Sequence, residues 1–278
     1  MLKYIITLIV GYYGLKRLIF ILTFRPKLNP YNSLFTSITG NPLSFYKNVP
    51  MMEYKQERAK YTLIVSHGQG SDIAKCDLNM ATLSRDLGVN LVCYDYQGYG
   101  IHGKYRDCSE DACYRDLVNV YSYITSNGVN PKQIILMGIS LGSGPTVDVA
   151  SRMSVGGVIL VAPYTSIIRA SSVYLGYWLP EILSQIPTID IFENIKKIHR
   201  ISAPLYLVHG QKDDVIPIYH GEKLASIAKS HGKLWRERYI PEAKHLNLLS
   251  LGREAFVKDL KEFLSVLCTD VNFLKGTR

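Results

Sequence analysis

Short apolar runs separated by longer amphipathic stretches make up most of the chain after residue 60. Runs typical of buried strands lie near residues 61–66, 90–95, 133–138, 156–161, 204–209 and 234–240. Apolar residues at helical spacing lie near residues 77–87, 109–126, 141–153, 218–230 and 249–267, and a lead-in near 43–54 suits an antiparallel sheet edge. This alternation predicts an α/β domain in which helices flank a mostly parallel sheet.

The first residues follow another pattern, because residues 4–24 are apolar and are interrupted chiefly by Lys16 and Arg17. A helix of this length could cross a bilayer, but each charge costs about 2.5–3.5 kcal/mol at the bilayer centre. Three interpretations stay open: a spanning signal-anchor helix, a helix lying in the membrane interface, and a core-docked helix or signal peptide. We take residues 1–28 as a membrane-anchor segment and residues 29–278 as the main domain.

The net charge of +9 is concentrated near the N-terminus. Residues 1–60 carry nine Lys and Arg residues but only two acids, Glu53 and Glu57. This distribution favours an anionic membrane face, rather than nucleic acid, as the partner. One basic residue, Lys3, precedes the apolar segment, whereas four lie within or just after it: Lys16, Arg17, Arg25 and Lys27. The positive-inside bias therefore predicts that the main domain faces the cytosol.

The five cysteines follow no metal-site or disulfide spacing, and the chain has no Asn-x-Ser/Thr glycosylation acceptor. Both observations favour a reducing compartment.

A candidate nucleophile lies at residues 138–142, Gly-Ile-Ser-Leu-Gly, between an apolar run and an amphipathic stretch. A serine needs a sharp strand-to-helix turn to project its hydroxyl above a sheet, and only glycines fit on either side of that turn. This context predicts that Ser140 is the nucleophile. Because a serine hydroxyl is a poor nucleophile at neutral pH, a base, an acid and oxyanion donors must also be present.

Later loops supply the base and the acid in the expected order. Asp213 and Asp214 follow the predicted strand at 204–209, and His245 follows the predicted strand at 234–240. The carboxyl ends of strands are where ligand chemistry occurs in open parallel sheets. We expect His245 to be the base and favour Asp213 as the acid that orients it, with Asp214 as the alternative.

The oxyanion donors are expected from two turns. Residues 66–70, Ser-His-Gly-Gln-Gly, follow the first predicted parallel strand, and Leu141 follows the nucleophile. Backbone N–H groups of Gln69 and Leu141 would then hold the oxyanion. We interpret the side chain of His67 as structural rather than as a general base.

Four blocks resemble the α/β-hydrolase-domain serine hydrolases: residues 61–68 (Tyr-Thr-Leu-Ile-Val-Ser-His-Gly), 94–100 (Tyr-Asp-Tyr-Gln-Gly-Tyr-Gly), 135–152 around the nucleophile, and 209–217 (His-Gly-Gln-Lys-Asp-Asp-Val-Ile-Pro). The resemblance covers about residues 40–267 and is strongest to the membrane-associated branch that includes protein depalmitoylases. It implies the α/β-hydrolase fold, a mechanism without metal or cofactor, and the same five site residues, Ser140, Asp213, His245, Gln69 and Leu141.

Two departures from the family pattern stand out. Lys244 and Leu246 flank His245, where the family usually has Gly before the histidine and a polar residue after it. Animal depalmitoylases also carry a lipidated cysteine cluster near the N-terminus, whereas the first cysteine here is Cys76. We therefore expect the apolar N-terminal segment to provide the membrane attachment.

The interval at about 164–200 is too long and too apolar for a simple connection, and we expect it to form a cap over the nucleophile. Its residues Tyr174, Tyr177, Trp178 and Leu179 would bind an acyl chain, unless they merely extend the core.

The expected function is hydrolysis of fatty-acyl thioesters or esters, with S-palmitoyl groups on proteins implied by the resemblance. The alternatives are a lipase or carboxylesterase acting on small glycerolipids, and a non-catalytic binding protein that retains the fold. The expected partners are an acylated protein or lipid and a membrane surface, without nucleic acid.

Overall fold

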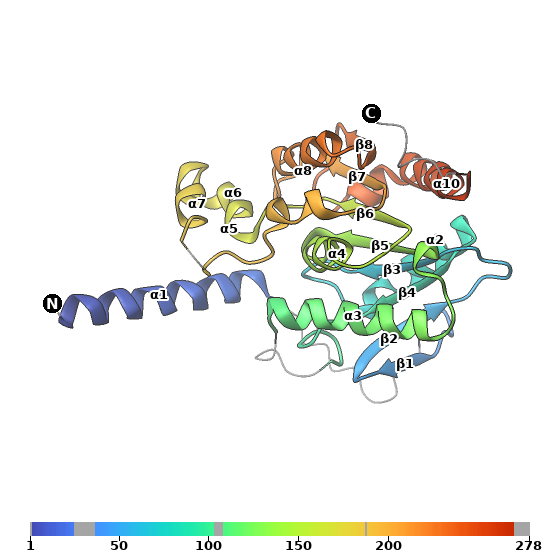
Figure 1. Ribbon diagram of the computed structural model, residues 1–278, viewed down its shortest axis with the longest axis horizontal. Helices are drawn as coiled ribbons and strands as arrows, with labels where there is room; N and C mark the ends of the chain where they lie inside the picture. Colours follow the sequence, from blue (N-terminus) through green and yellow to red (C-terminus); the bar gives the residue numbers. More distant parts are fainter. Residues whose placement is uncertain (1, 25–36, 103–107, 187, 270–278) are drawn as a thin grey trace.

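The computed structural model describes residues 2–24, 37–102, 108–186 and 188–269. In these residues one sheet runs in the order β1-β2-β4-β3-β5-β6-β7-β8 (Figure 1). Its strands are β1 Leu43–Tyr46, β2 Val49–Tyr54, β3 Thr62–Ser66, β4 Asn90–Tyr94, β5 Ile134–Ile139, β6 Gly157–Val161, β7 Leu205–Gly210 and β8 Leu234–Ile240. Strands β3 to β8 are parallel, and the β1–β2 hairpin forms the antiparallel edge. The predicted α/β-hydrolase fold is confirmed.

Helices cover both faces of the sheet (Figure 1). The longer ones are α1 Leu2–Thr23, α2 Ile73–Leu87, α3 Glu110–Ser126, α4 Ser143–Ala150, α8 Tyr219–Ser230 and α10 Arg253–Thr269. The short ones are α5 Ile167–Ala170, α6 Ser172–Leu175, α7 Trp178–Leu183 and α9 Leu248–Leu251, with 3-10 turns at η2 Pro131–Gln133, η3 Ser140–Gly142, η4 Asn194–Lys196 and η5 Ile198–Arg200.

Two apolar clusters form the core, one on each face of the sheet. Helices α3, α4 and α8 pack on one face, whereas α2 and α10 pack on the other. Successive strand residues point to opposite faces, so Leu136 of β5 joins the first cluster and its neighbours Ile135 and Met137 join the second. Burial on both faces explains why the parallel strands read as continuous apolar runs in the sequence.

Capping residues set helix ends that apolar spacing did not predict. The Asp72 side chain accepts the Lys75 backbone N–H at 3.0 Å, so α2 begins at Ile73 rather than near residue 77. Gly88, with φ +64°, ends the same helix in a left-handed conformation. The helix predicted over 249–267 is divided at Gly252 into α9 and α10.

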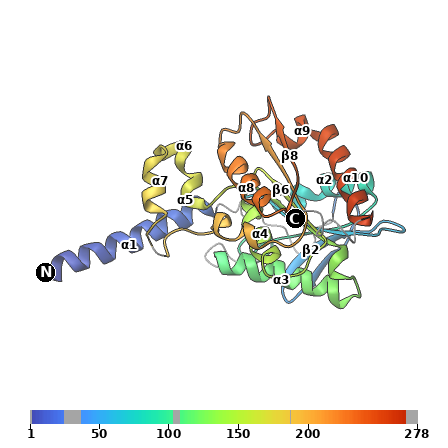
Figure 2. The same ribbon diagram turned by 45° about the horizontal axis from the view of Figure 1, so that its top comes forward.

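Helix α1 projects from the domain beside the helices of the predicted cap, α5 to α7 (Figures 1 and 2). The hydroxyl groups of Tyr12 and Thr188 are hydrogen-bonded to each other across this junction. Phe24, directly after α1, is 1% exposed and belongs to the core cluster beneath α3 and α4. The N-terminal segment and the main domain therefore share a core at this residue.

Among the helices that the structure describes, none combines the length and apolarity needed to cross a membrane. Arg25 and Lys27, used above for the orientation, lie outside the described residues.

Candidate active site

Ser140 lies in the strained turn that its motif predicts. It follows β5 directly and has φ +52°, a left-handed backbone that non-glycine residues rarely adopt. An added Cβ on Gly138 would lie 2.5 Å from the carbonyl oxygen of Gly142, and one on Gly142 would lie 2.0 Å from that of Ser66. Only glycine fits at both positions, so close packing sets the spacing of the motif.

The turn brings Ser140 to a histidine and an acid from two later loops. The Ser140 Oγ lies 2.9 Å from His245 Nε2, and His245 Nδ1 lies 2.8 Å from Asp213 Oδ2. Asp214 points elsewhere: its side chain is 56% exposed and lies 3.5 Å from the Lys244 Nζ. The geometry thus favours Asp213 over Asp214 as the partner of the histidine.

Asp213 sits in a site that favours its charged form. Its Oδ1 accepts the backbone N–H groups of Val215 at 2.9 Å and Ile216 at 2.7 Å. Burial alone would raise the pKa of the Asp213 carboxyl, but hydrogen bonds to His209 and His245 and those backbone donors lower it well below its usual range. The carboxylate therefore stays ionised at neutral pH and can hold the imidazole of His245 by its Nδ1–H.

His209 of β7 is a further neighbour of the site. Its Nε2 lies 2.8 Å from the backbone oxygen of Ile216 and 3.4 Å from Asp213 Oδ2. Its side chain is fully buried. Because it contacts both Asp213 and Ile216, it holds the loop that carries the acid. Its position at the end of a strand, four residues before the aspartate, was the available signal.

The loop after β3 lies against the nucleophile. A Cβ added to Gly68 would lie 3.7 Å from Ser140 Cβ, in ordinary van der Waals contact. The Tyr96 hydroxyl donates to the backbone oxygen of His67 at 2.7 Å, and the Tyr164 hydroxyl donates to that of Leu141 at 3.0 Å. A buried tyrosine hydroxyl thus holds the backbone of each turn that is expected to supply an oxyanion donor.

The His67 side chain occupies a structural position, as interpreted from the sequence. It is fully buried, its Nδ1 lies 2.9 Å from the Gly68 oxygen, and its Nε2 lies 3.6 Å from Asp95 Oδ1. Burial alone would lower the pKa of His67, but the interaction with Asp95 raises it overall. The imidazole connects the loop to the end of β4, and its partners among the described residues are Gly68 and Asp95 rather than Ser140.

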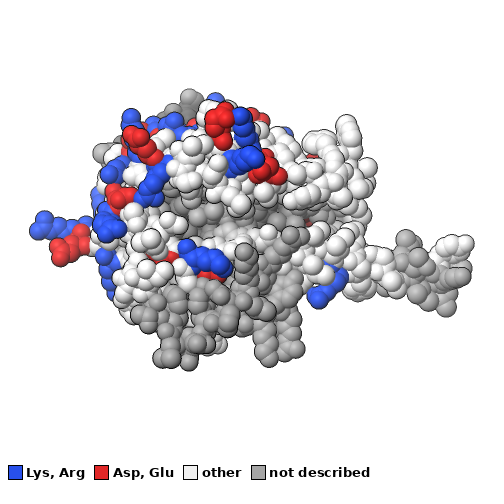
Figure 3. Space-filling model, turned by 180° about the vertical axis from the view of Figure 1, so that it is seen from behind, with Lys and Arg blue, Asp and Glu red and all other residues white. Residues whose placement is uncertain are grey.

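The expected acyl-binding residues lie on or next to the short helices α6 and α7, which contact Tyr219 of α8. Tyr174 and Trp178 are each 78% exposed, and Tyr177 and Leu179 are also exposed. Charged side chains are few over these helices, at the upper right of Figure 3, and gather at the left and top of that view. Tyr164, at the start of the predicted cap interval, is instead buried behind Leu141. The four residues form an apolar surface; acyl binding stays a prediction.

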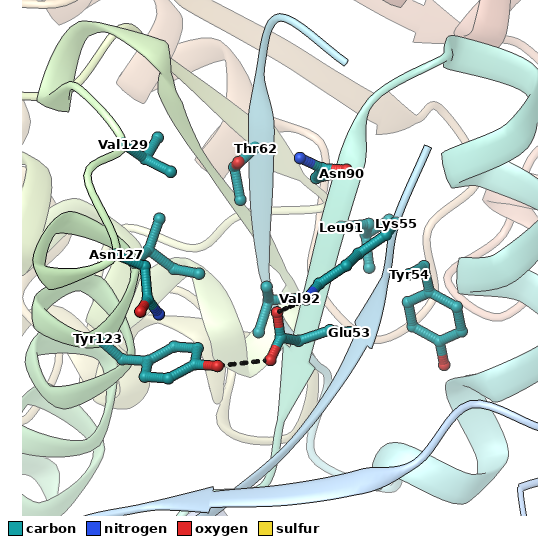
Figure 4. Close-up of a pocket in the computed structure, with 11 residues that line it drawn as sticks. Glu53, Tyr54, Lys55, Thr62, Asn90, Leu91, Val92, Tyr123, Asn127 and Val129 are labelled. Carbon is teal, nitrogen blue, oxygen red and sulfur yellow. Dashed lines mark hydrogen bonds and ion pairs between the residues drawn. The ribbon is translucent and has the colours of Figure 1, made fainter. Parts of the chain in front are cut away.

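A separate cavity of about 330 Å³ lies near the amino-terminal ends of β3 and β4 (Figure 4). Thr62 and Asn90, which line it, begin β3 and β4, whereas Ser140 follows the carboxyl end of β5. The Tyr123 hydroxyl donates to Glu53 Oε1 at 2.8 Å there. The residues that line this cavity include none of the predicted site residues. Among the described residues, no cluster of His, Cys, Asp or Glu is suited to hold a metal ion.

Comparison with known sequences matches residues 75–267 to the prolyl oligopeptidase family. An α/β hydrolase of Acanthamoeba polyphaga mimivirus is 30% identical over 79% of this chain and 79% of its own length. The alpha/beta hydrolase domain-containing protein 17B of Homo sapiens is 32% identical over 74% of this chain and 67% of its own length. These similarities confirm the resemblance seen in the motifs.

Solved structures support the same fold. An esterase of Pyrococcus furiosus superposes with a TM-score of 0.66 at 17% identity, covering 87% of this chain and 98% of the esterase. The alpha/beta hydrolase domain-containing protein 10 from mouse superposes with a TM-score of 0.58 at 15% identity, over 82% of this chain and 99% of its own.

Proposed function

Because this chain belongs to the serine hydrolases of the α/β-hydrolase fold, within the prolyl oligopeptidase family, we propose that it hydrolyses fatty-acyl thioesters or esters. S-acyl groups on proteins, such as S-palmitoylcysteine, are the first substrate class. The observation that carries this proposal is the hydrogen-bonded series Ser140, His245 and Asp213. The exposed apolar residues of α6 and α7 support an acyl substrate.

In the first half of the reaction, Ser140 Oγ attacks the acyl carbonyl carbon while His245 Nε2 takes its proton. The carbonyl oxygen becomes negative and is held by the backbone N–H groups of Gln69 and Leu141. Asp213 keeps the histidine in the tautomer that carries its proton on Nδ1 and stabilises the imidazolium. The carbon–sulfur or carbon–oxygen bond then breaks, and the leaving group takes the proton from His245.

In the second half, water replaces the leaving group. His245 removes a proton from the water, whose oxygen attacks the acyl-serine carbonyl through a second oxyanion. Collapse releases the fatty acid and returns the proton to Ser140. His245 and Asp213 act in both halves, so a variant of either should slow acylation and deacylation together.

An apolar acyl group suits the exposed apolar surface of α6 and α7. Transferring a methylene from water to an apolar surface contributes roughly 0.8 kcal/mol when it is fully buried, so a long chain could supply much of the binding energy. Oxygen esters use the same chemistry at Ser140, so a carboxylesterase or lipase acting on small glycerolipids is the second candidate. The apolar cap supports both candidates.

We also propose that the protein approaches its substrate on a membrane surface, through α1 and the cap. Val10, Tyr13 and Leu18 of α1 are exposed, and Lys16 and Arg17 lie among them. Aromatic and basic side chains around an apolar surface are typical of contact with anionic lipid headgroups. The cytosol-facing orientation stays a prediction of the sequence.

Labelling with a fluorophosphonate tests the assignment of the nucleophile. Wild-type protein should be labelled, and Ser140→Ala should lose both labelling and turnover, since loss of a triad serine can lower kcat by about 10⁶. Labelling of Ser143→Ala, which changes the next serine along the chain, should persist. Undiminished labelling of Ser140→Ala would contradict the proposal.

A substrate panel tests the class of reaction. We expect kcat/KM on acyl thioesters and oxygen esters to rise from acetyl to palmitoyl chains. A peptide-amide series, included because of the prolyl oligopeptidase match, should react far more slowly. Preference for the peptide amides would replace the proposed substrate class but keep the same three residues.

A further inference from the structure

The side chain of Gln69 connects the oxyanion loop to the N-terminal helix. Its Nε2 donates to the backbone oxygen of Leu22 at 2.7 Å and to that of Thr23 at 2.6 Å. Leu22 and Thr23 are the last two residues of α1, and Gln69 lies in the loop that follows β3. One side chain thus joins the first helix of the chain to a predicted component of the active site.

The pairing satisfies groups that a helix end leaves without partners. The last carbonyls of an α-helix have no intrahelical donor and carry the partial negative charge of the helix dipole. A primary amide offers two N–H donors, enough for both carbonyls. Thr23 is buried, so its carbonyl would lack full compensation from water if Gln69 moved away. The contact therefore restrains the loop as well as the helix.

The helix end is itself fixed in the core. The Thr23 hydroxyl donates to the Ile19 carbonyl at 2.7 Å, and the Phe24 N–H donates to the Phe20 carbonyl at 2.9 Å. The Phe24 ring packs against the ring of Phe192 with centroids 6.1 Å apart.

Phe192 in turn fills the space beside the helix that carries the nucleophile turn. A Cβ added to Gly144 of α4 would lie 2.3 Å from Phe192 Cδ1. The last turn of α1, Phe192 and the start of α4 therefore form one packed unit, and Gln69 extends that unit to the oxyanion loop.

We propose that the last turn of α1 positions the oxyanion hole by holding the Gln69 side chain, which fixes the direction of the Gln69 backbone N–H. Among the described residues this N–H has no protein acceptor, as a donor reserved for an oxyanion requires. The inference rests on the proposed function, because the direction of the N–H affects catalysis only if an oxyanion forms at Ser140. Gln69 then acts through its side chain as a positioning residue for its own backbone donor.

Two variants remove the side-chain contact and retain the backbone donor. Gln69→Ala deletes the amide, and Gln69→Glu keeps its size but places a carboxylate against two carbonyl oxygens. On a soluble short-chain ester, kcat per active site should fall by roughly 10- to 100-fold with KM changed less than about twofold. This range is below the 10²–10³ loss seen when an oxyanion donor is removed altogether.

Gln133→Ala is the matched control. The Gln133 side-chain amide also donates to a backbone carbonyl, that of Lys60 at 3.1 Å. Gln133, however, directly precedes β5, so it lies at the end of the strand opposite to Ser140. Active sites are counted by fluorophosphonate titration, which separates slower chemistry from a smaller folded fraction. Gln133→Ala should retain the wild-type kcat.

A double-mutant cycle tests the helix side of the contact. Phe24→Leu should loosen the last turn of α1 and lower kcat in the wild-type background, but should have little further effect on kcat in Gln69→Ala. Additive effects would show that Phe24 and Gln69 act independently and would overturn the proposal. So would a wild-type kcat per titrated site in Gln69→Ala. Failure of the proposed function is recognised separately, because wild-type protein and Gln133→Ala would then both lack labelling at Ser140; that result would overturn this inference too.

Discussion

The chemistry of individual residues follows from how tightly their neighbours confine them. Ser140 keeps a left-handed backbone that costs of order 1–3 kcal/mol, and the close packing of Gly138 and Gly142 holds it there. Asp213 is confined in another way, because two backbone donors and two histidines surround its carboxylate. In both cases local contacts, together with a contact from a distant part of the chain, stabilise a residue that is unfavourable in isolation.

The two adjacent acids should differ sharply in their effect. Asp213→Asn should lower kcat by about 10⁴, because the amide cannot hold His245 in the required tautomer. Asp214→Asn, which changes an exposed residue beside Lys244, should leave kcat within about twofold of wild type. Steady-state kinetics on a short-chain ester measures both, and a larger loss for Asp214→Asn would reassign the acid.

Buried His220 should make the protein less stable in mild acid. Burial, together with electrostatic interactions with His209 and Arg169, lowers the pKa of His220 to about 3, whereas an unfolded histidine has a pKa of about 6.5. Between these values the unfolded chain binds the extra proton, so the free energy of unfolding should fall as the pH falls from about 6.5 towards 3.

Urea unfolding at several pH values between 7 and 4 measures this loss. His220 contributes a slope of at most about 1.4 kcal/mol per pH unit. His220→Gln should have a shallower slope than wild type, whereas His199→Gln at an exposed position should not. Equal slopes in His220→Gln and wild type would refute the assignment.

At the scale of elements, the sequence predicted the strands, which depend on local patterns, and missed contacts between residues that are far apart in the chain. All the strands after residue 60 lie close to their predicted ranges, because burial on both faces leaves a continuous apolar run. The contact of Gln69 with the end of α1 was not predictable, because it joins residues 46 positions apart and no periodicity records it. Tyr164 was assigned to the cap interval by its neighbours, yet it packs behind Leu141 in the core.

The cap helices should affect acyl-chain length rather than chemistry. If Trp178 on α7 binds an acyl chain, Trp178→Ala should lower kcat/KM on palmitoyl substrates at least 10-fold more than on acetyl esters. Phe45→Ala removes an exposed aromatic side chain from β1, at the far edge of the sheet, and should not discriminate between chain lengths. Equal losses on both substrates for Trp178→Ala would mean that the cap only supports the fold.

At the scale of the whole molecule, the N-terminal segment joins the core of the main domain at its inner end. Its exposed residues face outward with the cap, whereas Phe24 lies inside the hydrolase core. The sequence divided the chain at residue 28 because the apolar pattern ends near there. The pattern could not indicate that the last turn of α1 contributes to the fold that follows, since a buried and a membrane-bound phenylalanine look alike in sequence.

Charge on α1 should control binding to anionic lipid. Replacing both Lys16 and Arg17 by Glu should weaken binding to vesicles that contain phosphatidylserine by more than roughly 1 kcal/mol per substitution, because each basic residue is lost and a repelled negative charge is added. A control with Lys55→Glu and Lys60→Glu changes the net charge by the same amount, in the connection between β2 and β3. Vesicle sedimentation at low and high salt measures the difference, and equal losses in both double variants would attribute the effect to net charge alone.

Helix α1 is fixed at its inner end and projects from the domain at its outer end, so its length sets a distance. A helix of 22 residues is about 33 Å long, and its inner end is fixed beside the oxyanion loop. If its outer part rests on a bilayer, the nucleophile is held at a nearly constant height above the lipid. Substrates would then be selected by reach: acylated cysteines near the bilayer would enter the site, whereas those presented far from it on rigid domains would not, whatever sequence surrounds them.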